Sequence, residues 1–137
     1  MKVKDVMSVH VHVLGANDTI ETAAQLMLRE DIGSVPVHDG DKLIGMVTDR
    51  DIVTRGIAAG RDASTPIGDI MSTGVKYCYD HDTVEAVARN MAELQVRRLP
   101  VVDGEKRLIG FVSLANIASA ENALATDALL EGVAQPH

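Results

Sequence analysis

Thr48 and Asp51 are a pair of polar side chains whose types and spacing suit the binding of a small molecule. They stand where the strand-like run Lys42–Thr48 gives way to a helix that we expect to reach about Ala59. A hydroxyl at such a junction lies beside the free backbone N–H groups of the first helical turn, a place that suits a phosphate. A carboxylate three residues further on lies on the same side and can accept hydrogen bonds from ribose hydroxyls. The same pair is also a helix cap, because both side chains can bond the same backbone donors, so both interpretations stay open.

This pattern occurs twice because the sequence consists largely of two similar repeats. Residues 5–42 and 69–106 are identical at 14 of 38 positions, with a constant offset of 64. Arg107 is one extra residue in a turn of the second copy, where insertions are tolerated. Beyond it the offset is 65, so Thr48 and Asp51 correspond to Ser113 and Asn116.

Each copy predicts the same order of elements from its apolar periodicity and its turn residues. The first copy gives an extended segment at Val9–Val13, a helix opened by Asp18-Thr19-Ile20-Glu21, strands at Ser34–His38 and Lys42–Thr48, and a helix that ends before Gly60. The second copy gives a helix from Thr83 to about Gln95, strands at Arg98–Val102 and Arg107–Val112, and a helix from Leu114. The predicted fold class is therefore α/β (α+β), with the order β-α-β-β-α in each copy.

The predicted organisation is a first repeat at 1–59, a linker at 60–66, a second repeat at 67–122, and a C-terminal helical extension and tail at 123–137. The last twenty residues, 118–137, carry an apolar stripe with helical spacing that needs a partner surface. Neither repeat of about 60 residues buries much apolar surface alone. We therefore expect the two repeats to pack across their strand faces around a pseudo-twofold axis.

Composition excludes several classes of protein. The chain of 137 residues has 13 Lys and Arg against 20 Asp and Glu, a net charge of −7, which makes nucleic-acid binding a poor expectation. Aromatic residues are 2% of the chain, too few for base-stacking platforms. A single cysteine, Cys78, gives no internal disulfide, and neither a signal peptide nor a membrane span is expected, so we expect a soluble cytoplasmic protein.

The two motifs that end the duplicated strands carry a family resemblance. They read Gly45-Met46-Val47-Thr48-Asp49-Arg50-Asp51-Ile52 and Gly110-Phe111-Val112-Ser113-Leu114-Ala115-Asn116-Ile117. Together with the repeated Met-Ser, Asp-Thr and Pro-Val pairs, they resemble the CBS domain family. The tandem arrangement looks like one Bateman module over about residues 1–122, similar to the small stand-alone bacterial CBS-pair proteins.

The resemblance implies a non-enzymatic regulatory sensor of adenosine-containing ligands (AMP, ADP, ATP, sometimes S-adenosylmethionine), with no catalytic residues and no cofactor. It also implies a homodimer, built as a flat disc of four repeats, whose geometry a protein partner reads. That partner is unknown.

The resemblance also implies how each ligand cleft is assembled, with the ribose motif from one repeat and basic residues from the other. In the first cleft, Thr48 would contact phosphate and Asp51 ribose, while Arg97 and Arg98 face the phosphates. Adenine would lie against Met46, Val75 and Tyr77. The alternative for the two arginines is a solvated basic spot at a helix end.

The second cleft departs from the family pattern. It would contain Ser113, Asn116 and Phe111, with Ser34 beside the equally uncharged Gly33 at the positions that correspond to the arginines. Arg50 is expected to point across to this cleft. Because Asn116 replaces the acid, we predict that the cleft of Thr48 and Asp51 binds more tightly.

Two other hypotheses remain beside the sensor. One is a constitutive dimeric scaffold whose clefts are empty. The other is a metal or redox responder that uses His10, His12 and Cys78, with His38 as a further candidate ligand. Two histidines on one strand face fall short of the three or four ligands that zinc needs, so no metal site is predicted.

Overall fold

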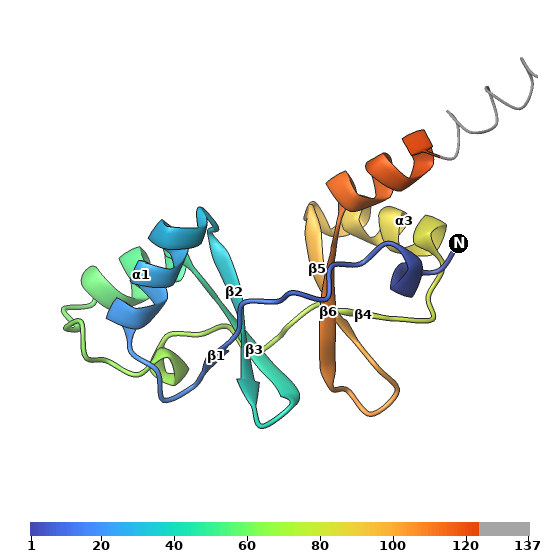
Figure 1. Ribbon diagram of the computed structural model, residues 1–137. Coiled ribbons are helices and arrows are strands. Elements are labelled where there is room, and N and C mark those ends of the chain that lie inside the picture. The colour runs from blue at the N-terminus through green and yellow to red at the C-terminus, as the bar shows by residue number, and fades with distance from the viewer. Residues whose placement is uncertain (124–137) are drawn as a thin grey trace, which may run out of the picture. The chain divides into compact units, whose positions relative to one another are not determined.

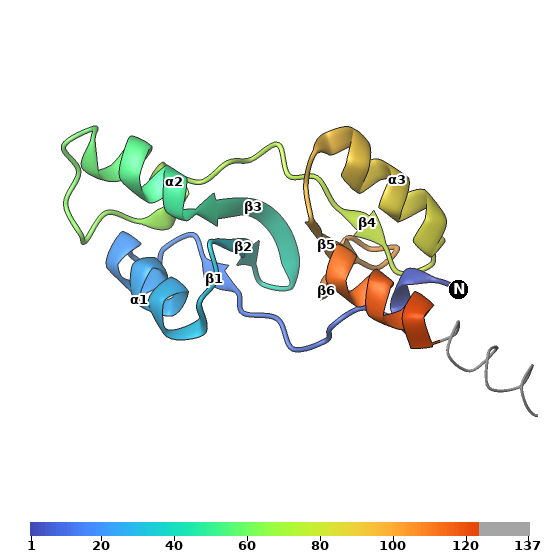
Figure 2. The same cartoon turned by 90° about the horizontal axis from the view of Figure 1, so that it is seen from above.

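The computed structural model describes residues 1–123, which form two compact units. Unit A comprises Val11–Lys76 together with Gly104–Leu108. Unit B comprises Met1–His10, Tyr77–Asp103 and the described residues from Ile109 onward. Each unit is a three-stranded sheet with its helices on one face, as Figures 1 and 2 show. The α/β fold class and the repetition of its order are confirmed.

Unit A has the order that its sequence predicts. Its elements are β1 (Leu14–Gly15), α1 (Ile20–Glu30), β2 (Ser34–Asp39), β3 (Lys42–Thr48), the helical turn α2 (Asp49–Asp51) that continues as the π-helix η2 (Ile52–Ile57), and the 3-10 helix η3 (Ile67–Asp69). β2 lies in the middle of the sheet, parallel to β1 and antiparallel to β3.

Local sequence explains where α1 and the hairpin begin and end. The Thr19 hydroxyl accepts a hydrogen bond of 3.1 Å from the Thr22 N–H and so caps the start of α1. Asp31 ends the helix in the left-handed region with φ of 54°. Gly40 turns the hairpin between β2 and β3 with φ of 62°, a conformation that glycine adopts without a steric cost.

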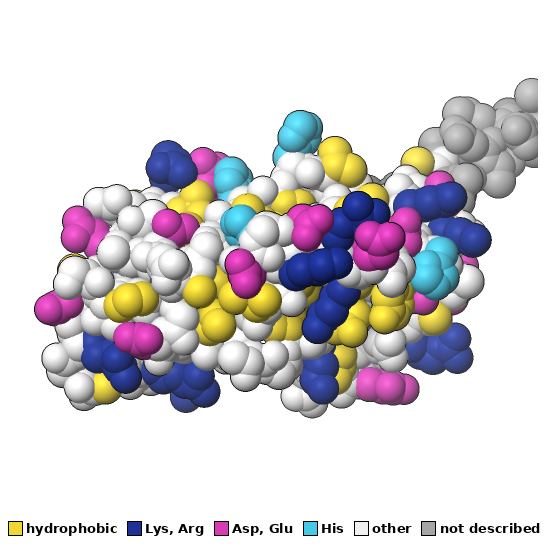
Figure 3. Space-filling model, turned by 90° about the horizontal axis from the view of Figure 1, so that it is seen from below, with side chains coloured by type: hydrophobic (Ala, Val, Ile, Leu, Met, Phe, Trp, Pro, Cys, Tyr) yellow, Lys and Arg dark blue, Asp and Glu magenta, His cyan; other side chains and the backbone are white. Residues whose placement is uncertain are grey.

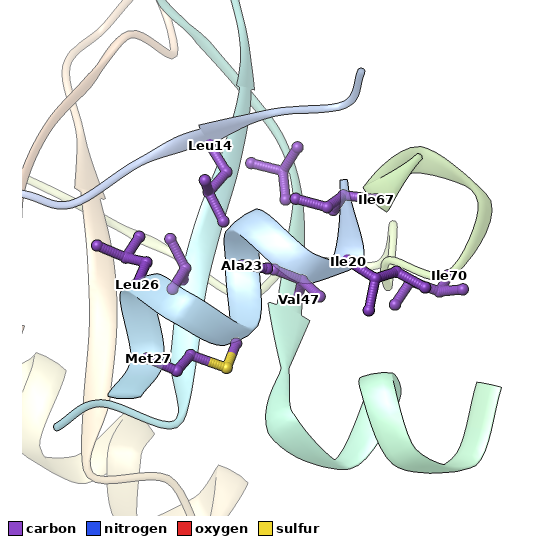
Figure 4. Packing of buried hydrophobic residues seen from close by; sticks show 10 residues of the cluster. Leu14, Ile20, Ala23, Leu26, Met27, Val47, Ile67 and Ile70 are labelled. Atoms are coloured by element: carbon purple, nitrogen blue, oxygen red, sulfur yellow. The ribbon is translucent and has the colours of Figure 1, made fainter. Parts of the chain in front are cut away.

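The core of unit A is aliphatic and lies between α1 and the sheet (Figure 4). Its fully buried members come from different elements: Ala23 from α1, Val35 and Val37 from β2, Val47 from β3, and Ile67 from η3. Ile67 follows the linker, so a segment of the second sequence repeat completes the core of the first.

Unit B repeats this architecture. Its elements are η1 (Val3–Asp5), β4 (Cys78–Tyr79), α3 (Val84–Leu94), β5 (Arg98–Val102), β6 (Leu108–Ser113, which belongs to unit B from Ile109 onward) and a helix over 114–123. The sheet order is β4-β5-β6, with β4 parallel to β5. Thr83 caps α3, and Gln95 ends it with φ of 57°.

The two repeats exchange their opening segments. Val3 of η1 is 0% exposed in the core of unit B, whereas Ile67 of η3, its counterpart 64 residues later, is 0% exposed in the core of unit A. The compact units therefore cut across the repeats that the sequence delimits. Within each unit, the opening segment therefore contacts a core whose other residues are distant from it along the chain.

The glycines of the two motifs make room for these exchanged segments. Ser72 and Met46 exchange backbone hydrogen bonds of 2.8 and 2.9 Å over Gly45. A Cβ on Gly45 would lie 2.6 Å from the Met71 sulfur and 2.9 Å from the Ser72 carbonyl oxygen. Gly110 lies in the same way under Met7 and Ser8 in unit B. In each unit, the repeated Met-Ser pair thus packs directly against the repeated glycine.

The predicted hairpins, α1, α3 and the cap residues are confirmed to within one or two residues. The first strand is the exception, because Val9–Val13 lies outside the sheet and the strand is the short β1 that follows it. Gly15 ends β1 because its N–H donates to the Asp18 carboxylate, which turns the chain into α1. The predicted helix over 118–137 is present as far as residue 123, and its remainder lies outside the described residues.

Candidate functional site

Ser113 and Asn116 close the first turn of the helix that follows β6. The Ser113 hydroxyl accepts a hydrogen bond of 3.0 Å from the Asn116 backbone N–H. In return, the Asn116 side-chain oxygen accepts bonds from the Ser113 backbone N–H at 3.1 Å and from its hydroxyl at 2.9 Å. The helix interpretation of this motif is therefore correct, and its ligand interpretation depends on what surrounds it.

A pocket of about 880 Å³ opens beside this helix start in unit B. Its lining combines a basic pair, an aromatic ring, small polar side chains and apolar side chains: Ser8, Arg97, Arg98, Phe111, Val112, Ser113, Leu114, Ala115, Asn116 and Ala118. Volumes of this order accept nucleotide-sized ligands. We refer to it below as the Arg98 pocket.

The backbone places both arginines at this pocket. Arg97 precedes β5, and its carbonyl oxygen accepts a hydrogen bond of 2.9 Å from the N–H of Leu114, the first residue of the helix. Arg98 begins β5, and its guanidinium carbon lies 4.6 Å from the centre of the Phe111 ring. This cation–π contact holds Arg98 over the pocket wall.

The Arg98 pocket is cationic. None of its ten lining residues is Asp or Glu. Within residues 1–123, neither Arg97 nor Arg98 forms an ion pair, and Arg98 has the Phe111 ring as its contact. Two guanidinium groups without a carboxylate partner are suited to bind an anion.

The corresponding helix start in unit A has the same geometry and a different charge. The Thr48 hydroxyl accepts from the Asp51 N–H, and the Asp51 carboxylate accepts from the Thr48 N–H, both at 3.0 Å. Asp51 is 9% exposed, and its second carboxylate oxygen lies 3.9 Å from the Arg55 guanidinium. The carboxylate is therefore a buried acceptor that is mostly committed to the cap.

Further differences follow at the neighbouring positions of unit A. Gly33 and Ser34 stand where unit B has the arginines, and the Gly33 carbonyl accepts from the Asp49 N–H at 3.0 Å. Asp49 replaces Leu114, and its carboxylate lies 3.1 Å from the place of a Cβ on Gly33. This corner of unit A thus carries two carboxylates, with Arg50 exposed between them in sequence.

The structure brings together five residues that the sequence analysis divided between two clefts. Arg97, Arg98, Phe111, Ser113 and Asn116 all line the Arg98 pocket. The prediction that the two arginines serve Thr48 and Asp51, and the prediction that the latter cleft is the tighter one, stay predictions.

The remaining predicted residues lie elsewhere. Ser34, Met46, Arg50 and Val75 belong to unit A, and their predicted part in a ligand cleft also stays a prediction. Tyr77 belongs to unit B, where its ring meets that of Tyr79 edge-on at 5.7 Å between centroids.

Sequence reasoning missed Ser8 as a pocket residue. Its N–H and carbonyl group exchange hydrogen bonds of 2.8 and 2.9 Å with the Phe111 backbone, so the N-terminal segment forms part of the pocket wall. The repeated Met-Ser pair was the available signal, but nothing in the sequence connected it with the glycine motif.

The residues of the metal or redox hypothesis do not gather. His12 lies 3.5 Å from the Glu30 carboxylate, whereas Cys78 is buried in the core of unit B. Burial raises the pKa of the Cys78 thiol to about 12, which opposes formation of the reactive thiolate. Among residues 1–123 no group of three or more His, Cys, Asp or Glu side chains is placed to hold a metal ion.

Two surface properties bear on the classes of partner. Basic and acidic side chains stand close together over much of the face in Figure 3, so this face is not a uniformly basic surface of the kind that nucleic acids favour. Across the described part of the chain, no helix has both the length and the apolar character that crossing a membrane requires.

Comparisons with known proteins agree with this architecture. The family model described as CBS domain matches residues 3–57 and again 67–123. CBS domain-containing protein YhcV of Bacillus subtilis is 41% identical over 116 residues, which cover 85% of this chain and 82% of that protein. Hypoxic response protein 1 of Mycobacterium tuberculosis is 41% identical over 117 residues, covering 84% and 81%. Homoserine O-acetyltransferase of Methanosarcina acetivorans is 33% identical, but the match covers only 21% of that enzyme.

Solved structures give the same picture. The crystal structure of Hypoxic Response Protein I with two coordinated zinc ions matches with a TM-score of 0.78 at 38% identity, covering 88% of this chain and 98% of the other. CBSX2 in complex with AMP matches at 0.78 and 27% identity, covering 90% and 98%. The CBS domain pair of MJ0100 with 5′-methylthioadenosine and S-adenosyl-L-methionine matches at 0.73 and 27% identity, covering 90% and 97%.

Proposed function

The chain belongs to the CBS domain family as a tandem pair, and we propose that it is a regulatory module that responds to an adenosine-containing ligand. CBS-pair proteins are generally regulatory and non-catalytic. The similarity to homoserine O-acetyltransferase involves a small part of that enzyme, so it gives no reason to assign acyl transfer to this chain. The candidate ligands are AMP, ADP, ATP and S-adenosylmethionine, which would make the protein a sensor of cellular energy or methylation state.

The observation that carries the proposal is the unpaired arginine pair in the Arg98 pocket. A phosphate or polyphosphate supplies oxygens that guanidinium groups bind bidentately. Leu114, Ala115 and Ala118 provide apolar lining in the same pocket, suited to a purine. Two structural neighbours are described with AMP or with S-adenosyl-L-methionine, which supports this ligand class.

We place the phosphate of this ligand against Arg97 and Arg98 and keep Thr48 and Asp51 as a second site. At the second site, Asp51 would accept from the ribose hydroxyls, and Met46 and Val75 would contact adenine. The surrounding charges favour tighter binding of an anion in the Arg98 pocket, because Asp49 and Asp51 repel an anion that the arginines attract. This proposed order is the reverse of the order that the sequence analysis predicts.

The regulatory output is proposed to be a change in the geometry of a homodimer that a protein partner reads, in the cytoplasm. The helices of unit A offer apolar surface for such contacts, since Leu28 is 85% exposed, Val53 59% and Ile57 65%. Unit B has Ala92, Ala118 and Asn122 at the corresponding positions, so the fold itself does not require large exposed apolar side chains there. Where such side chains lie together, they form the kind of exposed apolar patch that is typical of interaction surfaces.

Isothermal titration tests the proposal with AMP, ATP, S-adenosylmethionine and adenosine. Arg98→Ala should weaken AMP and ATP by about 1.5–3 kcal/mol, roughly 10- to 150-fold, and leave adenosine nearly unchanged. Arg89→Ala is the matched control and should change neither, because it removes the same charge from an exposed position of unit B outside the pocket lining. An equal loss for all ligands would reject the phosphate assignment, and no heat from any ligand would favour a constitutive scaffold.

A metal-responsive function is the second candidate, because a 38% identical structural neighbour is described with two coordinated zinc ions. Elemental analysis of the purified protein tests it, with His12→Ala as the comparison variant. Stoichiometric zinc that this substitution removes would support metal binding. Metal-free protein that still binds nucleotide would reject it.

A further inference from the structure

The hydrogen bonds of Asn116 fix which of its side-chain atoms is free for a ligand. The Ser113 backbone N–H can only donate, so the Asn116 atom that it meets at 3.1 Å is the carbonyl oxygen. The Ser113 hydroxyl occupies the same oxygen at 2.9 Å. Both acceptor positions of Asn116 are therefore used within the cap. What remains is the Nδ2 amide group, which has only protons to offer.

The Arg98 pocket therefore presents mainly donors, and none of its side-chain acceptors is charged. Arg97 and Arg98 are donor-only groups, and Asn116 adds its free N–H groups. No Asp or Glu lines the pocket, and the Ser113 hydroxyl already donates to Asn116. The side-chain acceptors that remain are the neutral hydroxyl oxygens of Ser8 and Ser113, because within residues 1–123 Ser8 bonds through its backbone and Ser113 accepts one bond, from the Asn116 N–H.

An unmodified ribose suits this lining less well than it suits the helix start of unit A, because the acceptors here are uncharged. Its 2′- and 3′-hydroxyls bring two protons, and each needs an acceptor once the sugar is removed from water. At the corresponding place in unit A, the Asp51 carboxylate consists of acceptors only and so suits those protons. A phosphate ester brings oxygens that accept and no proton that must be placed, and its bonds to N–H donors are charge-assisted.

We infer that the Arg98 pocket selects an adenine nucleotide that carries a phosphate on its ribose, at the 2′ or 3′ position, in addition to its 5′-phosphate. One phosphate binds the two arginines, and the other binds the Nδ2 group of Asn116. This inference rests on the proposed function, because it assumes that a nucleotide enters the pocket. It ranks the nucleotides with a free ribose, such as 5′-AMP, below these bisphosphates as ligands of the Arg98 pocket.

Titration at physiological ionic strength with 5′-AMP, adenosine 2′,5′-bisphosphate and adenosine 3′,5′-bisphosphate tests the inference. The wild-type protein should bind one of the bisphosphates about tenfold more tightly than 5′-AMP, or better. Asn116→Asp should abolish that preference, because the new carboxylate repels the second phosphate. This variant is expected to fold, since an aspartate forms the same cap with Thr48 in unit A.

Asn122→Asp is the matched control, because it adds the same charge at an exposed position of the same helix, away from the pocket lining. It should keep the preference for a bisphosphate. Binding of 5′-AMP as tight as that of both bisphosphates, or a preference that survives Asn116→Asp, overturns this inference and leaves the proposed function intact. Absence of binding by all three nucleotides overturns both.

Discussion

At the helix that follows each central hairpin, unit A presents Asp49 and Asp51 where unit B presents Leu114 and Asn116. The backbone is the same in both, since each helix start is closed by reciprocal side-chain and backbone hydrogen bonds near 3.0 Å. At the start of the preceding hairpin, Gly33 and Ser34 of unit A correspond in sequence to Arg97 and Arg98 of unit B. A duplicated scaffold thus keeps its caps and changes the charge of the surface around them.

The comparison teaches that the caps and the ligand preferences are separable. Caps are selected by the backbone donors of the helix, which are identical in the two units. The charge of the surroundings is free to change because none of the four differing side chains belongs to a hydrophobic core. The two halves can therefore serve different ligands, and each provides an internal control for the other.

The largest effect is expected from the exchanged opening segments. Ile67→Ala should destabilise the fold by about 2–5 kcal/mol, because Ile67 is fully buried and its loss leaves a cavity. Val3→Ala, at the corresponding position of unit B, should cost less because it removes fewer buried atoms. Urea denaturation measures both. Equal small losses would mean that these segments add little to either core.

Transfer of charge from unit B to unit A is expected to have the next largest effect. Ser34→Arg combined with Asp49→Leu gives unit A one of the arginines and removes one carboxylate. Affinity of the Thr48 and Asp51 site for 5′-AMP should rise by about 1.5–3 kcal/mol, seen as a second binding event in titration. Ser34→Leu with Asp49→Leu is the control for the arginine, and a gain of the same size there would show that the added guanidinium is not the cause.

Removal of the cap hydroxyls should have a smaller effect that is similar in the two units. Thr48→Ala and Ser113→Ala should each destabilise by about 0.5–2 kcal/mol, the usual cost of a lost N-cap. Thermal unfolding in the absence of ligand measures this. A loss confined to one unit would contradict the equivalence of the two caps.

The smallest effect concerns Cys78, whose counterpart in unit A is Leu14. Burial raises the pKa of the thiol from 9.0 to about 12, so the unfolded chain releases this proton at lower pH than the folded one. Stability should therefore fall as pH rises above about 9, by about 1 kcal/mol at pH 10. Cys78→Ala, compared with wild type over pH 8–11 by urea denaturation, should remove this part of the pH dependence. If the free energy of unfolding changed with pH in the same way in both proteins, the Cys78 thiol would not be the cause of the loss of stability.

Sequence alone was enough for the elements and their caps, because these depend on neighbours within a few residues. Asp18 and Thr19 determine the start of α1, and Gly40 determines the hairpin turn. The duplication itself predicted that two similar units exist. The first strand was misplaced because β1 has only two residues, too few for alternation to be recognised.

The hairpin register holds a signal that the sequence analysis did not use. In the antiparallel hairpin of unit A, Ser34, the first residue of β2, pairs with Thr48, the last residue of β3. The same rule applied to unit B puts Arg98 beside Ser113, where the pocket has both. Register arithmetic was thus sufficient to group the arginines with their own motif.

What the sequence by itself determined is the repeated backbone, since hydrophobic period, caps and turns are local and occur twice. Only the tertiary structure decided that Val3 of the first repeat completes the core of unit B and that Ile67 of the second repeat completes the core of unit A. It also decided that Ser8 bonds the Phe111 backbone at the pocket wall. These contacts join positions that are distant along the chain, and no local preference specifies them. They form because each sheet leaves an apolar face and a row of backbone groups that the exchanged segment buries and bonds.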